Sequence, residues 1–305
     1  MPIQEVSLFL MRYYFKFSMD FRKSFQWLSG LVLTVVLYSP LQAQYYYQDI
    51  YNTLQTNQEQ QVFRNAQVLS LKLTSLEPTQ QVNKDFKCHQ DFTDSYRQAL
   101  METSSFETGT SRLHTRFNAK LQLVASADSS AAGINTTTYA YDTSGRIVKV
   151  AFSFSSHAGG SMYDETETHV YRYDSLGILR KMKRFKNGSL YSVISFSPDS
   201  SGRPMDEVEV PLNGRTSRIA YHYTNDGLLS DIYKYNTMQK KWMPAYLFDY
   251  NQAGQLTEMT TVLLNENSYL LWKYSYNQKG LKDETSCFGK NSQPQGTIKY
   301  SYTYK

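Results

Sequence analysis

This chain has few of the residues on which most catalytic and metal sites depend. It contains two cysteines and five histidines, and the histidines are scattered along the sequence. No Gly-x-Ser-x-Gly, His-Glu-x-x-His or clustered Cys/His pattern occurs, so these signatures of hydrolases, metalloproteases and zinc sites are missing. We therefore expect no enzyme activity and no cofactor.

Strong charge and long apolar runs are also missing. The net charge of +5 falls to +3 once residues 1–43 are left out, which is too little to indicate a nucleic-acid partner. The run from Trp27 to Tyr38 is shorter than the about 20 residues that a membrane-spanning helix needs. We expect no nucleic-acid partner and no stable membrane span in the mature chain.

Residues 1–43 have the layout of an export signal. Arg22 and Lys23 precede the apolar run, and the segment that follows it ends at Ala43, a small residue suited to signal cleavage. We expect cleavage there and a periplasmic, cell-surface or secreted protein. Met19 fits the start site better than Met1, because it puts both cations near the N-terminus. No cysteine follows the run, so we expect no lipid attachment there.

Export would expose the two cysteines to an oxidising environment. Cys88 and Cys287 could then form a disulfide that closes a loop of about 200 residues, worth about 4 to 5 kcal/mol on the chain-entropy model. The alternative of two unrelated buried thiols fits the sequence equally well.

Tyrosine, in contrast, is abundant and lies in a repeat. Tyrosine supplies 26 of the 305 residues. Two aromatics one residue apart are followed by a short polar step and a glycine, with a period of about 26 residues, typical of repeat architectures. The copies are Tyr139–Gly145, Tyr171–Gly177, Ile194–Gly202, Tyr221–Gly227, Phe248–Gly254, Tyr274–Gly280 and the half-copy Tyr300–Tyr302. We read the third copy with Phe196 as its second aromatic and two extra residues before its glycine.

Each period predicts one β-hairpin, since residues two apart on a strand share a face and the glycine suits a tight turn. Stacked hairpins predict a mainly β fold, a long antiparallel hairpin-repeat sheet over residues 111–305. Residues 44–110 lack the repeat and predict a mixed, partly helical segment. Apolar spacing favours a helix over 58–73, and a shorter one is expected over 93–102.

The phrase Tyr-x-Tyr-Asp-x-x-Gly resembles the YD repeat of the Rhs family. Tyr139–Ile147 matches best, with Asp142, Gly145 and Arg146 in place, and the similarity covers about 139–305. The resemblance implies the strand-turn-strand unit and no particular reaction. Large relatives build closed shells around a cargo, for which some six hairpins are too few. Small exported relatives are regarded as surface or envelope proteins.

One long insertion and two tryptophans are the candidate ligand-binding elements. The surplus of the longest period lies in Ser155–Asp164, and inserts in repeat proteins often lie on the binding face, so His157 and Tyr163 are candidates. A tolerated loop insertion is the alternative. Trp242 and Trp272 could stack on sugar rings or peptide strands, although aromatic stripes are more often core.

Two acidic patterns are expected to be solvated. Glu165, Glu167 and His169 alternate, so they would point the same way on a strand and could hold a divalent metal. A solvated strand face is the favoured alternative, and no metal site is predicted. Acidic residues also recur four positions beyond the repeat glycines, which indicates a solvated stripe. They are Asp206, Asp231, Glu258 and Glu284.

Three functions fit these patterns. The first is an exported, non-enzymatic binding protein of the cell envelope with a carbohydrate or protein ligand. The second is a structural envelope protein that pairs through open sheet edges such as Thr297–Lys305. The third is an outer-membrane barrel, against which the charges on both faces of Lys181–Lys186 argue. The oligomeric state is left open.

Overall fold

The computed structural model describes residues 44–106, 108–156, 163–263 and 268–305. The expected export signal and His157 therefore lie outside the described residues. None of the described helices has the length and hydropathy needed to cross a membrane.

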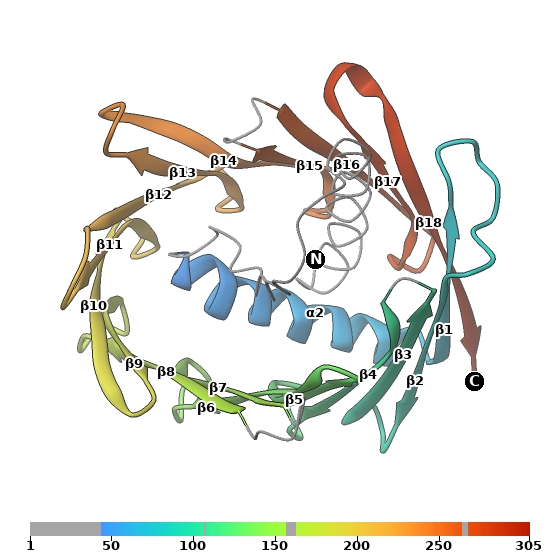
Figure 1. The fold of residues 1–305 in the computed structure, drawn as a ribbon, viewed down its shortest axis with the longest axis horizontal. Coiled ribbons are helices and arrows are strands. Elements are labelled where there is room, and N and C mark those ends of the chain that lie inside the picture. Colours follow the sequence, from blue (N-terminus) through green and yellow to red (C-terminus); the bar gives the residue numbers. More distant parts are fainter. Residues whose placement is uncertain (1–43, 107, 157–162, 264–267) are drawn as a thin grey trace, which may run out of the picture.

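Eighteen antiparallel strands close into one barrel (Figure 1). Each strand pairs with its neighbours in the chain, and the last strand returns to pair with the first. The strands are β1 (Val68–Leu76), β2 (Lys87–Thr93), β3 (Gln98–Ser105), β4 (Gly109–Phe117), β5 (Leu123–Ser130), β6 (Gly133–Tyr141), β7 (Ile147–Ser156), β8 (Tyr163–Tyr173), β9 (Leu179–Lys186), β10 (Ser189–Pro198), β11 (Pro204–Pro211), β12 (Ser217–Tyr223), β13 (Leu229–Asn236), β14 (Lys241–Tyr250), β15 (Leu256–Leu263), β16 (Ser268–Tyr276), β17 (Lys282–Phe288) and β18 (Pro294–Tyr304).

The helical segment that precedes β1 is short and lies inside the barrel. A π-helical turn, η2 (Tyr46–Tyr51), continues directly into α2 (Asn52–Asn65), and a 3-10 turn, η4 (Lys290–Ser292), precedes β18. Figure 1 shows α2 running across the lumen. The expectation of a mainly β chain with an N-terminal helix is confirmed.

The expected open sheet is wrong, because the N-terminal segment supplies strands. The segment 93–102, expected as a helix, contributes to β3, and the helix expected over 58–73 ends at Asn65. Gln67 has a φ of +56°, after which Val68 starts β1. Leu69 and Leu73 have helical spacing, but Leu71 and Leu73 also alternate as a strand does, and both are buried.

Barrel closure also removes the open edge expected at the C-terminus. β18 pairs with β17 on one side and with β1 on the other, from Val68 opposite Tyr304 to Leu76 opposite Thr297. The barrel therefore begins at Val68, and no boundary near residue 110 interrupts the sheet. Assembly through this edge is excluded in the closed barrel, since both rows of its backbone groups face neighbouring strands.

The repeat phrase forms a hairpin turn and a link to the preceding hairpin. Asp142 accepts the backbone N–H groups of Ser144 and Arg146 at 2.9 Å, and Gly145 has a φ of +79°. The hydroxyl of each second tyrosine donates, at 2.6–2.9 Å, to the first carbonyl of the preceding return strand. These pairs are Tyr141 with Leu123, Tyr173 with Ile147, Tyr223 with Pro204, Tyr250 with Leu229, Tyr276 with Leu256 and Tyr302 with Lys282.

The third copy is more regular than its sequence suggested. Pro198 pairs with Pro204, the position that the second aromatic occupies in the other copies, and Phe196 takes the buried first position. Asp199 then accepts two backbone N–H groups as Asp142 does. No residues are inserted. The reading of Phe196 as the second aromatic was wrong by two residues.

The two cysteines are buried thiols and not the halves of a disulfide. Cys88 on β2 accepts a hydrogen bond from the Thr103 hydroxyl at 3.4 Å. Cys287 on β17 packs in a different part of the core, with Trp272 and Met259. The alternative of two unrelated thiols describes this structure.

Candidate functional site

The helix is fixed to the barrel wall by a buried charge cluster, defined here as Asp49, Glu167, His169, Arg184, Glu207 and Glu209. These residues come from η2 and from strands β8, β9 and β11. Asp49, His169, Arg184, Glu207 and Glu209 are all less than one tenth exposed.

His169 is the centre of one half of this cluster. Its Nδ1 contacts the Asp49 carboxylate, and its Nε2 lies 2.7 Å from Oε1 of Glu167. Asp49 also accepts the Tyr171 hydroxyl at 2.6 Å. Arg184 donates to both oxygens of Glu167, at 2.8 and 2.9 Å. This bidentate geometry is the stronger form of a charge-assisted hydrogen bond.

The other half holds the start of the helix. Glu207 accepts the backbone N–H groups of Tyr45 and Tyr46 at 3.2 and 3.0 Å, and the Tyr221 hydroxyl at 2.7 Å. Since the first N–H groups of a helix have no intrahelical acceptor, a carboxylate there is stabilising. Glu209 accepts from the Tyr45 hydroxyl at 3.0 Å and also meets Ser192 and Arg184.

Burial and pairing shift the acid–base behaviour of this cluster. Burial disfavours protonated His169, but Asp49 and Glu167 outweigh it and raise its pKa to about 9. Burial also opposes ionisation of Glu167, yet His169 and Arg184 lower its pKa to about 2. For Glu207, burial dominates over the donated hydrogen bonds and raises the pKa to about 7.

The metal hypothesis finds no support in this geometry. Glu167 and His169 do share the inner face of β8, as their alternation predicts. Both ring nitrogens of His169 contact carboxylates, and Glu167 binds Arg184. Within residues 44–106, 108–156, 163–263 and 268–305, no group of three His, Cys, Asp or Glu residues is arranged to hold a metal ion. The favoured alternative, a solvated face, is wrong for His169, which is 3% exposed.

Three of the four predicted ligand-binding residues, Trp242, Trp272 and Tyr163, lie among the described residues. Trp242 is 37% exposed on β14, edge-on to Tyr235 with ring centroids 5.3 Å apart, and Arg218 lies over its ring. Trp272 is 2% exposed in the core, so it offers no open face for stacking. Tyr163 begins β8 opposite Ser156.

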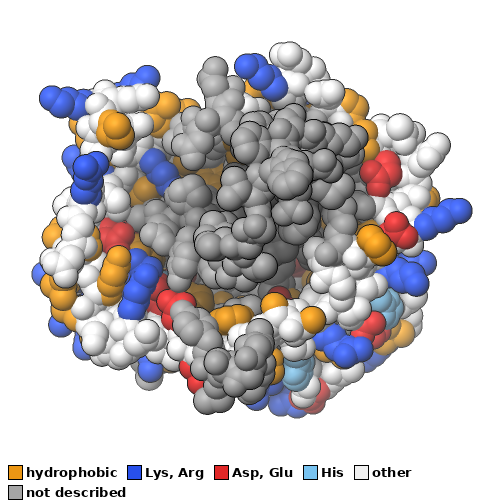
Figure 2. Space-filling model, viewed as in Figure 1, with side chains coloured by type: hydrophobic (Ala, Val, Ile, Leu, Met, Phe, Trp, Pro, Cys, Tyr) orange, Lys and Arg blue, Asp and Glu red, His pale blue; other side chains and the backbone are white. Residues whose placement is uncertain are grey.

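The acidic residues beyond the repeat glycines lie on the outer surface, as the sequence predicts. Each faces a basic partner on the adjacent strand, and the carboxylate side chains are 22–40% exposed. The pairs are Asp206 with Arg218, Asp231 with His222, Glu258 with Lys273 and Glu284 with Lys299. Figure 2 shows charged side chains of both signs around the periphery of the barrel.

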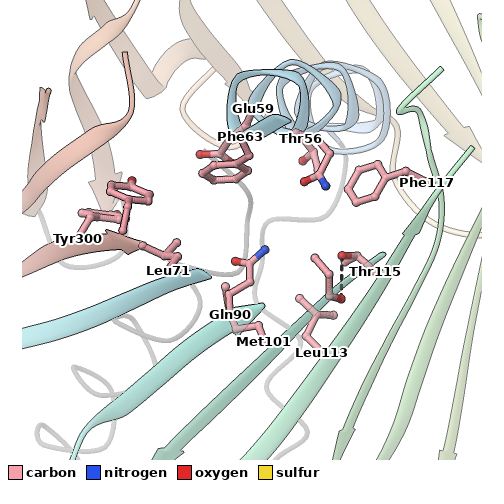
Figure 3. Close-up of a pocket in the computed structure, with 13 residues that line it drawn as sticks. Thr56, Glu59, Phe63, Leu71, Gln90, Met101, Leu113, Thr115, Phe117 and Tyr300 are labelled. Carbon is pink, nitrogen blue, oxygen red and sulfur yellow. Dashed lines mark hydrogen bonds between the residues drawn. The ribbon is translucent and has the colours of Figure 1, made fainter. Parts of the chain in front are cut away.

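Two cavities lie against α2. The smaller, about 70 Å³, lies between the helix and strands β18 and β1–β4. It is drawn in Figure 3, where Phe63 and Thr56 of the helix face Gln90 and Leu113 of the wall. It has room for a few water molecules only. The larger, about 280 Å³, lies between α2 and β14–β17 and is bordered by Tyr51, Asn52 and Tyr250, among others.

Sequence reasoning missed most of the buried charge cluster, although one signal was present. The position five beyond the repeat glycine points inward and is apolar in most copies, as Val150, Met182, Ile232 and Met259. Glu207 occupies this position in the third copy. A carboxylate in a core register indicates a buried partner.

Comparison with known proteins gives only distant similarity. No family model matches the chain, and no curated protein does. A porin-like protein from Bacteroides uniformis aligns with 77% of this chain and 98% of its own, at 9% identity and a TM-score of 0.32. A porin-like protein from Bacteroides vulgatus covers the same shares at 10% identity and a TM-score of 0.22. The toxin structure TcdB2-TccC3 without its hypervariable C-terminal region aligns over 72% of this chain and 15% of its own, at 12% identity and a TM-score of 0.24. Superpositions this weak carry no functional inference.

Proposed function

We propose that this chain is an exported, non-enzymatic binding protein of the cell envelope, with a carbohydrate or protein ligand. The carrying observation is the buried charge cluster, which fixes η2 and α2 inside the barrel through hydrogen bonds to β8, β9 and β11. A fixed internal helix lines a binding cavity and obstructs the lumen, so it suits ligand binding better than free passage of solutes.

The position of the helix inside the barrel accounts for its polar sequence. Asn57 accepts the Leu123 backbone N–H at 2.8 Å, and Gln60 donates to the Tyr96 carbonyl at 2.7 Å. Buried amides are stable when hydrogen-bonded. A Gln/Asn-rich helix is therefore suited to the interior of this barrel, and the helix acts as part of the fold.

The charged side chains on the outer face of the barrel support the proposal that this protein does not span a lipid bilayer. Lys181 and Lys183 are exposed on β9, and the Arg112–Glu102 pair is more than half exposed across β3 and β4. A lysine or arginine facing lipid near the bilayer centre costs about 2–4 kcal/mol. Charges near the middle of several strands thus disfavour a continuous apolar band.

An outer-membrane barrel is the second candidate, favoured by one observation. The barrel is closed, and its strands run 7–11 residues, close to the about 9–11 that cross a membrane.

Extraction and conductance distinguish the two candidates. We expect the exported protein to be released from envelopes by salt or osmotic shock without detergent, and to add no conductance to planar bilayers. Retention in the membrane until detergent is added, together with stepwise channel currents, would replace the binding proposal with the membrane barrel.

A further inference from the structure

One carboxylate at the start of the helix has only neutral hydrogen-bond donors around it. Glu207 is 1% exposed and accepts from the backbone N–H groups of Tyr45 and Tyr46 and from the Tyr221 hydroxyl. Among the described residues, the ion pairs of the buried charge cluster include its other three carboxylates and leave Glu207 out. Lys234 on β13 interacts with Glu207 only at longer range. Burial raises the pKa of Glu207 to about 7, as expected of a carboxylate without a counter-ion.

The expected export cleavage puts a new N-terminus beside this carboxylate. Hydrolysis of the Ala43–Gln44 peptide bond consumes one water molecule, leaves a carboxylate on Ala43, and gives Gln44 an α-amine that takes up a proton. This nitrogen precedes the Tyr45 nitrogen, which lies 3.2 Å from Oε1 of Glu207. Backbone dimensions keep the two nitrogens within about 4 Å of each other. The cleavage site was expected from the sequence alone, so its position next to Glu207 is an independent observation.

A charge on Gln44 needs a counter-ion. Gln44 is 0% exposed in the full chain, and its carbonyl accepts the Gln48 N–H at 2.8 Å, which puts it at the first helical turn. The positive end of the helix dipole, equivalent to about half a unit charge, opposes an ammonium there. A buried charge is stable only when it is paired. The full negative charge of Glu207 lies at this end of the helix and meets both requirements.

We propose that the α-ammonium of Gln44, formed by export cleavage, pairs with Glu207 and completes the buried charge cluster in the mature protein. This inference rests on the export part of the proposed function and adds a maturation step to it. The uncleaved chain has a neutral peptide N–H at position 44, so the ion pair forms only after processing. Cleavage therefore strengthens the attachment of the helix to the barrel wall.

The mature terminus is identified first. Intact mass and N-terminal sequencing of the protein released from envelopes should show Gln44 with a free α-amine. An N-terminal glutamine can also cyclise: the α-amine attacks the side-chain amide carbon, ammonia leaves, and the pyroglutamate formed carries no charge. Pyroglutamate at this position, or a start at any other residue, overturns the proposal.

A double-mutant cycle then tests the ion pair itself. The chains 44–305 and 42–305, which both contain every described helix and strand, are compared with and without Glu207→Gln. The two extra residues move the ammonium by about 7 Å of extended chain. In urea unfolding, the extension should lower the folding equilibrium constant about tenfold when Glu207 is present and leave it unchanged in Glu207→Gln. Equal effects in the two backgrounds overturn the proposal.

Two further variants are matched controls. Glu167→Gln alters the other half of the cluster, where Glu167 meets His169 and Arg184, so the extension should keep its tenfold effect in this variant. Gln44→Ala keeps the ammonium and cannot cyclise, so it should also keep the difference between the two chains. If Glu207→Gln does not fold, equal stability of 44–305 and 42–305, with Ala at position 44 in both, overturns the proposal.

The inference and the proposed function fail in different ways. A protein that is exported, released without detergent and non-conducting, but shows no coupling between Gln44 and Glu207, keeps the binding function and loses the ion pair. Channel currents overturn the binding function, and coupling measured in the same protein still supports the ion pair.

Discussion

The protonated His169 makes the stability of the barrel depend on pH in a defined window. Its pKa is raised from 6.5 to about 9 by Asp49 and Glu167, against the opposing effect of burial. A raised pKa means that the folded state holds the proton more tightly than the unfolded chain. The stabilisation is therefore complete below pH 6.5 and is lost as the pH rises through 9.

The magnitude follows from the size of the shift. At about 1.4 kcal/mol per tenfold change in proton affinity, the rise of the pKa from 6.5 to about 9 contributes about 3 kcal/mol to the free energy of unfolding. His169 is 3% exposed, so solvent screening removes little of this. At roughly 2–4 °C per kcal/mol, the Tm falls by about 6–12 °C across the window.

The assay is urea unfolding of wild type and His169→Gln at pH 6.5, 7.5, 8.5 and 9.5, followed by tryptophan fluorescence. Lys234 titrates with the opposite sign, since burial lowers its pKa to about 8 and the folded state recovers stability above that pH. The pKa of Glu207 is raised from 4.5 to about 7, so its effect on the free energy of unfolding changes mainly between pH 4.5 and 7, below most of the range in which His169 titrates. The difference between wild type and variant at each pH isolates His169.

A surface histidine provides the matched control. His222 also contacts an aspartate, Asp231, but it is 54% exposed, so His222→Gln should change stability by about 0.5 kcal/mol or less. Should His169→Gln prevent folding, Asp49→Asn tests the same linkage by removing the anion that raises the pKa. The reasoning is refuted if the variant keeps the wild-type slope between pH 6.5 and 9.

Three further predictions concern the fold. Tyr223→Phe removes the hydroxyl that donates to the Pro204 carbonyl at 2.6 Å, and it should lower the free energy of unfolding by about 1–2 kcal/mol; an unchanged value would mean that the hydroxyl link is not stabilising. Gly133→Ala should lower the free energy of unfolding by about 3 kcal/mol, because the φ of Gly133 is +148° and the new Cβ would lie 2.3 Å from a carbonyl oxygen of the facing strand. Gly109→Ala, with open space around it, should lower it by about 1 kcal/mol. Equal losses in chemical denaturation would contradict this. Thiol titration without reductant should find both cysteines reactive only after denaturation, and no reactive thiol in the denatured protein would contradict the absence of a disulfide.

The hairpin unit can be predicted from the sequence alone, because its causes are local. Backbone N–H groups two and four residues beyond Asp142 reach its carboxylate, the positive φ of Gly145 needs no distant contact, and alternation decides which side chains share a face. The recurrence of acidic residues four positions beyond the repeat glycines likewise predicted that the stripe from Asp206 to Glu284 lies on the solvated surface. The helix was predicted, but its end was not, since Leu69 and Leu73 fit either period.

Closure of the sheet and the position of the helix inside it depend on contacts between distant parts of the chain, so they emerge only in the folded barrel. Closure depends on the number of strands in the whole chain and on their combined twist, and five of the strands, β1–β5, precede the first clear repeat phrase. The buried charge cluster depends on the same closure: Asp49 and His169 are 120 residues apart and meet only because the helix enters the lumen. Charged side chains that look solvated along a strand become buried partners once the barrel surrounds them.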